Sequence, residues 1–348
     1  MKKIIVILTG FLFLALGFYV VDEYKLLEQE NIKEKLNVTE LKTDQTKKDK
    51  KSMLKGDLFE IIGEKTNVLE DEFGTPIRKD MTPYGYKWWV YTDEQSNFIL
   101  FGVEDNVVET IFATGEDVSI KPFKIGDSYE ELDEKFSFQS EVSYQDGLSF
   151  YNFKLNEEDM NINPLIKLSD NLFIVAYFDT FTNELSSVRI STGNMLTKQR
   201  FFEMEYRGSL PEEESLSEDE WVKIEESMEQ QIYEMTNVYR QRFNLAPLKQ
   251  DKDVAKVAYS HSEDMYENNF FSHDSQDGRN LKDRLEEENI YYLSAGENIA
   301  AQHTDALAAM EGWLNSEGHR EAMLFEDYNY IGVGVHHLYY TQNFLSKP

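Results

Sequence analysis

Two histidines and one glutamate near the C-terminus have the side chains that metal or acid-base chemistry needs. His273 follows two phenylalanines and a serine, Glu297 lies between a glycine and an asparagine, and His319 lies between a glycine and an arginine. Two neutral imidazoles with a carboxylate suit zinc or another divalent metal. A metal-bound water could attack a carbonyl with Glu297 as base, and without a metal the histidines and Glu297 could share a proton in acid-base work. Glu297 could equally be structural, accepting backbone N–H groups in a tight loop.

Composition limits which functions the chain can have. All 6 histidines lie in the last quarter of the sequence, so imidazole chemistry is confined to the C-terminal part. The chain has no cysteine, which excludes disulfide scaffolds, thiol catalysis and thiolate metal sites. A net charge of -30 argues against nucleic acid as a partner, because phosphate binding needs a basic surface. A length of 348 residues with 41% hydrophobic residues predicts two packed domains.

Amphipathic helices must position the candidate residues. A helix over 221–243 is predicted by a stripe of apolar residues, and Ser217 with Glu220 fits a capping box before it. A second helix, over 251–268, carries His261 on its apolar face, where we expect a buried core histidine. Asp305 can cap a third helix that ends near residue 316. Gly318 then predicts a tight break, which would hold His319 at a junction between helices.

Residues 228–348 resemble the bacterial branch of the CAP superfamily, the cysteine-rich secretory, antigen 5 and pathogenesis-related (SCP-like) proteins. Five motifs occur in the family's order: Phe-Ser-His at 271–273, Ala-Gly-Glu-Asn-Ile-Ala at 295–300, Trp-x-x-Ser-x-Gly-His-Arg at 313–320, Ile-Gly-Val-Gly at 331–334 and Tyr-Thr-Gln-Asn-Phe at 340–344. The resemblance implies an α-β-α sandwich around an antiparallel sheet. It also implies a cleft lined by His273, His319 and Glu297 that can hold zinc or another divalent metal.

The sequence departs from that family pattern in two places. A second acid is expected shortly after the tryptophan, where this chain has Asn315 and Ser316, with Glu317 as a nearby substitute. The connection over 335–339 lacks the glycine or asparagine of a tight turn, so we expect a trimmed hairpin. Its adjacent histidines, His336 and His337, should face opposite ways on a strand. We therefore expect that these two cannot serve one site together, and that His303, just before a helix, lies at the surface and has no part in the chemistry.

The N-terminal part divides by composition into further segments. An uncharged apolar run from Ile4 to Val21 makes residues 1–21 a signal anchor or a signal peptide, with the bulk of the chain outside the cell. Residues 22–55 form a lysine-rich stalk, 56–200 a first domain, 201–220 an acidic linker and 221–348 the CAP domain. We therefore expect the protein at the extracellular face of the membrane, or secreted if residues 1–21 are cleaved.

The first domain contains an internal repetition. In each half, a glycine and a short helix precede strands rich in aromatic and β-branched residues, which predicts an α+β domain of two similar helix-plus-antiparallel-strand units. The segment also resembles the N-terminal domain that accompanies the CAP module in some bacterial proteins. Trp88 and Trp89 are neighbours on a predicted strand, so we expect one to face the core and the other the surface.

Three functions are compatible with these residues. The first is a surface binding module whose His/Glu cleft holds a metal, a lipid or a ligand derived from the cell envelope. The second is a hydrolase of peptide or envelope substrates that uses His273, Glu297 and His319 as catalytic residues. The third is a structural or partner-binding envelope protein, since one fold can host several activities.

Overall fold

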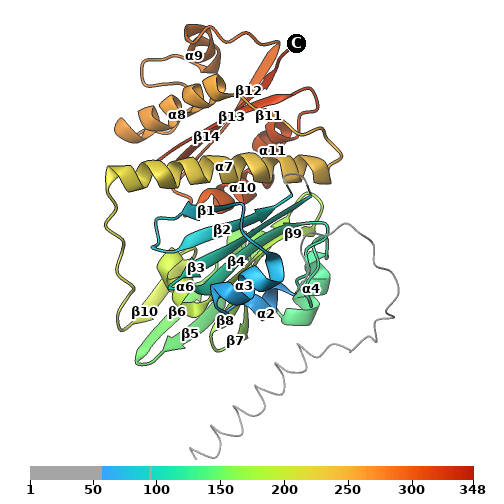
Figure 1. The fold of residues 1–348 in the computed structure, drawn as a ribbon, viewed down its shortest axis with the longest axis vertical. Coiled ribbons are helices and arrows are strands. Elements are labelled where there is room, and N and C mark those ends of the chain that lie inside the picture. Colours follow the sequence, from blue (N-terminus) through green and yellow to red (C-terminus); the bar gives the residue numbers. More distant parts are fainter. Residues whose placement is uncertain (1–56, 94–95) are drawn as a thin grey trace, which may run out of the picture. The chain divides into compact units, whose positions relative to one another are not determined.

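The long helix α7 (Glu218–Arg242) is the element around which the other described parts are arranged. The structure is a computed structural model that describes residues 57–93 and 96–348. Figure 1 shows α7 lying between a large sheet built from the N-terminal half and a smaller sheet built from the C-terminal quarter. The capping box of Ser217 and Glu220 is present, and the apolar stripe that begins at Met228 is buried. Both predictions are confirmed.

The N-terminal half forms a seven-stranded antiparallel sheet in the order β1-β2-β3-β4-β9-β8-β7. Its strands are β1 (Arg78–Met81), β2 (Lys87–Thr92), β3 (Asn97–Glu104), β4 (Val107–Gly115), β7 (Leu165–Ser169), β8 (Leu172–Asp179) and β9 (Glu184–Thr192). Helices α2 (Leu58–Ile61), α3 (Thr66–Phe73), α4 (Tyr129–Phe136), α5 (Glu157–Ile162) and α6 (Gly193–Gln199) accompany them. Each half supplies a helix and a run of antiparallel strands, which confirms the α+β class.

Both faces of this sheet are covered, contrary to our expectation for the tryptophan pair. Trp88 is 1% exposed and packs in a core shared with α7, whereas Trp89 is 7% exposed and packs in a second core with α2 and α3. Neighbours on a strand do point to opposite faces. The prediction of a surface tryptophan was wrong because helices cover the second face as well.

The remaining N-terminal strands form a separate three-stranded sheet. It consists of β10 (Glu203–Arg207), β6 (Ser149–Lys154) and β5 (Glu141–Asp146), in that order. Strand β10 therefore lies within the range 201–220 that was expected to be a linker.

The C-terminal third is an α-β-α sandwich, as the resemblance implied, although its two-residue edge strand is parallel to its neighbour and not antiparallel. Its four-stranded sheet has the order β11 (Lys249–Gln250), β13 (Tyr330–His336), β14 (Tyr339–Ser346) and β12 (Ser294–Ala301). Helix α8 (Lys252–Glu267) packs on one face, and α9 (Leu281–Glu287) lies nearby. A Cβ on Gly332 or Gly334 would come within 2.3 Å or 1.9 Å of the α8 backbone. The two glycines of β13 therefore let helix and strand approach closely.

The hairpin between β13 and β14 is not trimmed. The two strands pair along their whole length from Tyr330↔Leu345 to His336↔Tyr339. A two-residue turn joins them, in which His337 and Leu338 have φ angles of 41° and 64°. This tight turn needs two residues in the left-handed region, a role usually filled by asparagine or glycine. Histidine and leucine fill it here, which is why the sequence did not reveal it.

Helix α10 (Ala306–Leu314) is capped by Asp305, as predicted, and α11 (Glu317–Met323) follows. The junction between the two helices falls at Asn315 and Ser316, and Gly318 lies inside α11. His319 is therefore in the first turn of a helix rather than at a glycine break. The prediction was wrong because Ser316 has an extended backbone and already begins the new helix.

Buried polar contacts join the C-terminal sandwich to the N-terminal sheet. Arg189 on β9 donates two hydrogen bonds of 2.7 and 3.0 Å to Asp305, the cap of α10, and both side chains are buried. Glu311 on α10 is fully buried and accepts hydrogen bonds of 2.8 Å and 2.5 Å from the hydroxyls of Ser186 and Ser187. Because buried charges are costly without partners, these contacts fix one docking arrangement.

The apolar run from Ile4 to Val21 and the lysine-rich segment 22–55 lie outside the described residues. Within residues 57–93 and 96–348, none of the helices has the length and apolarity needed to cross a bilayer.

Candidate functional site

Three elements of the C-terminal sandwich carry the predicted site residues. His273 lies in the loop between α8 and α9, Glu297 lies on β12, and His319 lies on α11. The loop and the strand are brought together directly, because Nδ1 of His273 lies 3.0 Å from Oε1 of Glu297. His319 joins them through its backbone, whose carbonyl accepts a 3.0 Å hydrogen bond from the amide of Asn298.

The side chain of Glu297 is buried, and both of its oxygens are occupied. Its side chain is only 4% exposed, and while Oε1 accepts from His273, Oε2 accepts a 2.6 Å hydrogen bond from Arg284 Nη2. The guanidinium of Arg284 is itself 6% exposed. The pair is a buried ion pair, in which each charge compensates for the desolvation of the other.

This arrangement determines the proton position on His273. A carboxylate only accepts hydrogen bonds, so the proton lies on Nδ1 and, in the neutral ring, Nε2 carries the lone pair. The His273 side chain is 56% exposed, so its outer edge is open to solvent. The hydrogen bond to Glu297 raises the pKa of His273 above its ordinary 6.5, and this outweighs the lowering by partial burial.

Behind this pair lies a second, buried imidazole. His261 is 1% exposed, as predicted for a core histidine, and its Nε2 donates to the Ser272 carbonyl at 3.0 Å. Its Nδ1 accepts from Arg284 Nη1, also at 3.0 Å. Since a carbonyl only accepts and a guanidinium only donates, His261 is neutral. Burial lowers its pKa, and the charge of Arg284 adds to that effect.

His319 has a different electrostatic environment from His273. It is half-buried, and burial lowers its pKa below 6.5, with a further lowering from the nearby charge of His273. The site therefore pairs one imidazole that holds its proton more tightly with one that releases it more readily. A neutral His319 is available as a ligand at neutral pH.

The predicted trio does not have the spacing of a compact three-ligand set. Among the described residues, one group of three possible ligands is that compact: it consists of Glu225, His336 and His337. One ligand atom from each of them lies within 4.8 Å of the other two. Glu297 instead contacts His273 from behind, as an outer carboxylate does for a metal-binding imidazole. The arrangement leaves the ring of His273 open to solvent, with the half-buried His319 near enough to feel its charge.

At the position where the family has a second acid, Asn315 has another role. Asn315 accepts 2.8 Å hydrogen bonds from the backbone and hydroxyl of Thr180 and donates a 2.9 Å bond to the Phe178 carbonyl. It therefore attaches the α10–α11 junction to the β8–β9 turn of the N-terminal sheet. Glu317, the nearby substitute, is exposed at the start of α11.

Arg284 is the site residue that the sequence reasoning missed. It lies on the short helix α9, one position before the buried Leu285. Besides Glu297 and His261, its Nη1 donates to the carbonyl of His273 at 3.0 Å. Its position on the apolar side of a seven-residue helix was the available signal, because an arginine there needs a buried partner.

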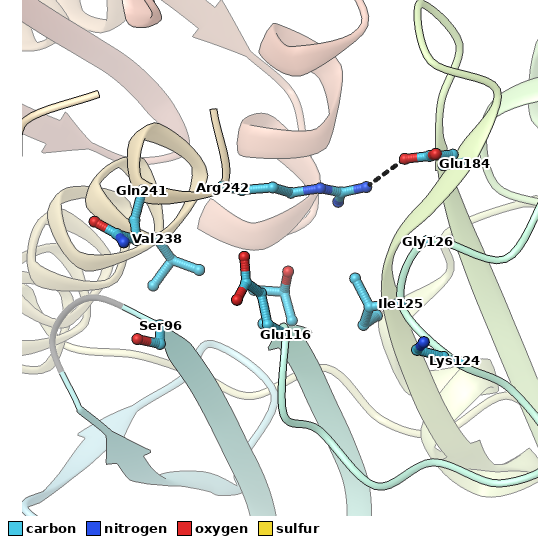
Figure 2. Close-up of a pocket in the computed structure, with 11 residues that line it drawn as sticks. Ser96, Glu116, Lys124, Ile125, Gly126, Glu184, Val238, Gln241 and Arg242 are labelled. Carbon is cyan, nitrogen blue, oxygen red and sulfur yellow. Dashed lines mark hydrogen bonds and ion pairs between the residues drawn. The ribbon is translucent and has the colours of Figure 1, made fainter. Parts of the chain in front are cut away.

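A separate pocket lies between the N-terminal sheet and the C-terminal end of α7. Figure 2 shows Arg242 of α7 reaching towards Glu184, from which it is separated by 3.4 Å, above a floor that includes Ile125 and Glu116. Its volume is about 280 Å³. None of the predicted site residues lines this pocket, and its arginine already has a carboxylate partner.

Comparison with known proteins agrees with this architecture. The sequence models of a CAP-associated N-terminal domain and of the cysteine-rich secretory protein family match residues 62–202 and 233–346. The Bacillus subtilis protein named "Uncharacterized membrane protein YlbC" is 43% identical over 290 residues, which are 83% of this chain and 84% of the relative.

Two crystal structures are similar along most of the chain. An extracellular protein with an SCP domain from Bacillus anthracis is 38% identical with a TM-score of 0.81, covering 88% of this chain and 99% of that one. A cysteine-rich secretory protein from Staphylococcus aureus is 26% identical with a TM-score of 0.75, covering 85% and 94%. This chain belongs to the cysteine-rich secretory protein (CAP) family and carries the CAP-associated N-terminal domain.

Proposed function

We propose that this chain is a surface or secreted binding protein in which His273 and His319 hold a divalent metal such as zinc. One observation carries the proposal: Arg284 fixes Glu297, and Glu297 holds the Nδ1 proton of His273. A metal-binding histidine commonly donates its other ring N–H to such a carboxylate, which orients the ring and raises its basicity. Nε2 of His273 is then free to bind a cation from the solvent side.

Two imidazoles leave several coordination positions open. A zinc ion held only by His273 and His319 would take its remaining ligands from water or from a bound molecule. A carboxylate, phosphate or carbonyl group of an envelope-derived ligand has suitable oxygen atoms for those positions. The proposed role is therefore ligand capture through a bound metal.

The proposed location, at the cell surface or secreted, is supported by what two similar proteins are called. One relative is named a membrane protein, and one similar structure is described as an extracellular protein. The apolar run at the N-terminus would serve as its anchor or export signal.

A hydrolase is the second candidate, and the same His273–Glu297 pair favours it. A carboxylate that orients an imidazole also prepares that imidazole to act as a general base. In this version His273 would take the proton. Glu297 would orient the ring of His273 and would not itself be the base, because both carboxylate oxygens are already occupied.

Titration of the full-length chain with zinc chloride by calorimetry tests the proposal. We expect one equivalent of zinc to bind at this site, and its affinity to weaken at least tenfold in His273→Ala and in His319→Ala. His303→Ala, a change at a histidine outside the site, should bind zinc as the parent does. Zinc binding that is unchanged in both site variants would overturn the proposal. Peptidase activity that requires His273 but no added metal would favour the hydrolase instead.

A further inference from the structure

The turn between β13 and β14 brings two adjacent histidines to one place. On a regular strand His336 and His337 would face opposite sides, as we had expected. The strand ends at His336, however, and the left-handed backbone of His337 redirects its side chain. The ring centroids are 4.7 Å apart, so that expectation was wrong.

A buried carboxylate of α7 meets both residues. Glu225 is 3% exposed, and its Oε1 accepts a 3.0 Å hydrogen bond from the backbone N–H of His337. The same oxygen lies 3.3 Å from Nδ1 of His336. Ligands at about 2.0 Å from a tetrahedral ion are separated by about 3.3 Å. Glu225 and His336 therefore already have the spacing of two ligands of one metal ion.

Aromatic side chains hold the two imidazoles in position. Tyr266 stacks on His337 with a centroid distance of 4.4 Å and an interplanar angle of 9°, and Trp221 lies 4.6 Å from the same ring. The hydroxyl of Tyr259 lies 3.1 Å from Nδ1 of His336. Fixed ligands lose little side-chain freedom when they bind an ion, which favours affinity.

The other ring nitrogen of His336 is compatible with a metal on Nδ1. Nε2 of His336 is buried and, among the described residues, has no hydrogen-bond partner, although the residue is only 8% exposed. The carboxylate of Glu267 lies 4.0 Å from this nitrogen. A metal on Nδ1 would leave the proton on Nε2, directed at Glu267 as an outer carboxylate.

The surroundings are acidic and accessible. Glu218 lies 3.7 Å from Nε2 of His337 and is well exposed, so its side chain is within reach as a further ligand. A cavity between α7 and α8, with a volume of about 740 Å³, includes Glu225 and Tyr259 in its lining and gives a route from solvent.

We propose that Glu225, His336 and His337 form a second divalent-metal site, separate from the His273–His319 pair. One ligand atom from each of the three residues lies within 4.8 Å of the others. Two imidazoles and a carboxylate favour zinc and similar transition metals over calcium or magnesium, which prefer all-oxygen ligands. Because the site joins α7 to the β13–β14 turn, bound metal would stabilise the packing of these two elements.

The test uses the full-length chain carrying His273→Ala and His319→Ala, so that the other candidate site is removed. Zinc chloride titrated into this chain should still bind with about one equivalent. Added His336→Gln, or Glu225→Gln, should weaken that binding at least tenfold. His337→Asn is a third variant, because asparagine tolerates the left-handed turn. His303→Ala is the matched control and should leave binding unchanged.

Zinc binding that is unchanged in these three variants would overturn the proposal. A measurement on the unsubstituted chain covers the case in which a variant does not fold. In two-dimensional NMR spectra of the histidine rings, zinc should shift the resonances of His336 and His337 and leave those of His303 in place. Ring resonances of His336 and His337 that do not respond to saturating zinc would also overturn it.

Discussion

Nη2 of Arg284 lies 2.6 Å from Oε2 of Glu297, and the two side chains are 6% and 4% exposed. The other oxygen of Glu297 meets His273 at 3.0 Å, so one carboxylate joins a buried guanidinium to an exposed imidazole. A residue on a short helix thereby controls the orientation of a side chain in a neighbouring loop. The pair holds the site together and prepares His273 to bind a cation or a proton.

Substitution of Arg284 should destabilise the protein strongly. In Arg284→Leu, Glu297 is left buried without its cation, so we expect the free energy of unfolding to fall by about 3 kcal/mol or more. The double variant Arg284→Leu with Glu297→Leu should recover much of that loss, because no unpaired charge remains. Urea denaturation measures both values.

Arg279→Gln is the control for this prediction. Arg279 also contacts acids, Asp277 and Glu287, but its side chain is 44% exposed. Exposed ion pairs contribute less than about 1 kcal/mol. A loss as small in Arg284→Leu as in Arg279→Gln would contradict the role given to the buried pair.

The pKa values of the two imidazoles of the site should be shifted in opposite directions. The pKa of His273 lies above 6.5 because of its hydrogen bond to Glu297, and the pKa of His319 lies below 6.5 because of burial. NMR titration of the metal-free chain should therefore show His319 losing its proton at lower pH than His273. Glu297→Gln should lower the pKa of His273, whereas Glu317→Gln, at an exposed acid, should not. The opposite order of titration would contradict this view of the site.

The motifs predicted the positions of the site better than its contacts. His273, Glu297 and His319 were found from short motifs, and buried His261 was found from the apolar stripe of its helix. The contact of Arg284 with Glu297 could not be predicted, because α9 and β12 meet only in the tertiary fold. Local sequence gives a periodicity but not the identity of the neighbour across a core.

Two of the errors differ in their physical origin. One of Trp88 and Trp89 was expected at the surface, because a strand pattern does not show how many layers cover a sheet. The side chains of His336 and His337 were expected on opposite faces, because the alternation of a strand was assumed to continue through position 337. The turn there was not recognised, since it has no glycine or asparagine. The first error concerns a covering layer that the strand itself does not show, and the second a left-handed turn that histidine and leucine do not favour.

The buried contact between Arg189 and Asp305 should contribute strongly to stability, and urea denaturation measures that contribution. Asp305→Asn keeps an acceptor for the Ala308 N–H that caps α10, but it leaves Arg189 buried without a counter-charge. We expect a loss of about 3 kcal/mol in the free energy of unfolding. Lys154→Gln, which breaks the exposed pair with Glu205, should cost less than about 1 kcal/mol. Equal losses in the two variants would contradict this contribution of the buried contact.

Glu229 on α7 should make stability depend on pH. Burial raises its pKa to about 7. The 3.0 Å hydrogen bond that it accepts from the Val335 N–H acts in the opposite direction. A raised pKa favours the protonated folded state, so this stabilisation is complete below pH 4.5 and is lost as pH rises through 7. Glu229→Gln keeps the acceptor and cannot ionise. Its free energy of unfolding relative to the parent should increase between pH 4.5 and 7, by at most about 3 kcal/mol.

Urea denaturation at several pH values measures this difference. Glu226→Gln, at an exposed neighbour, should follow the parent, and a Glu229→Gln profile parallel to the parent's would contradict the prediction.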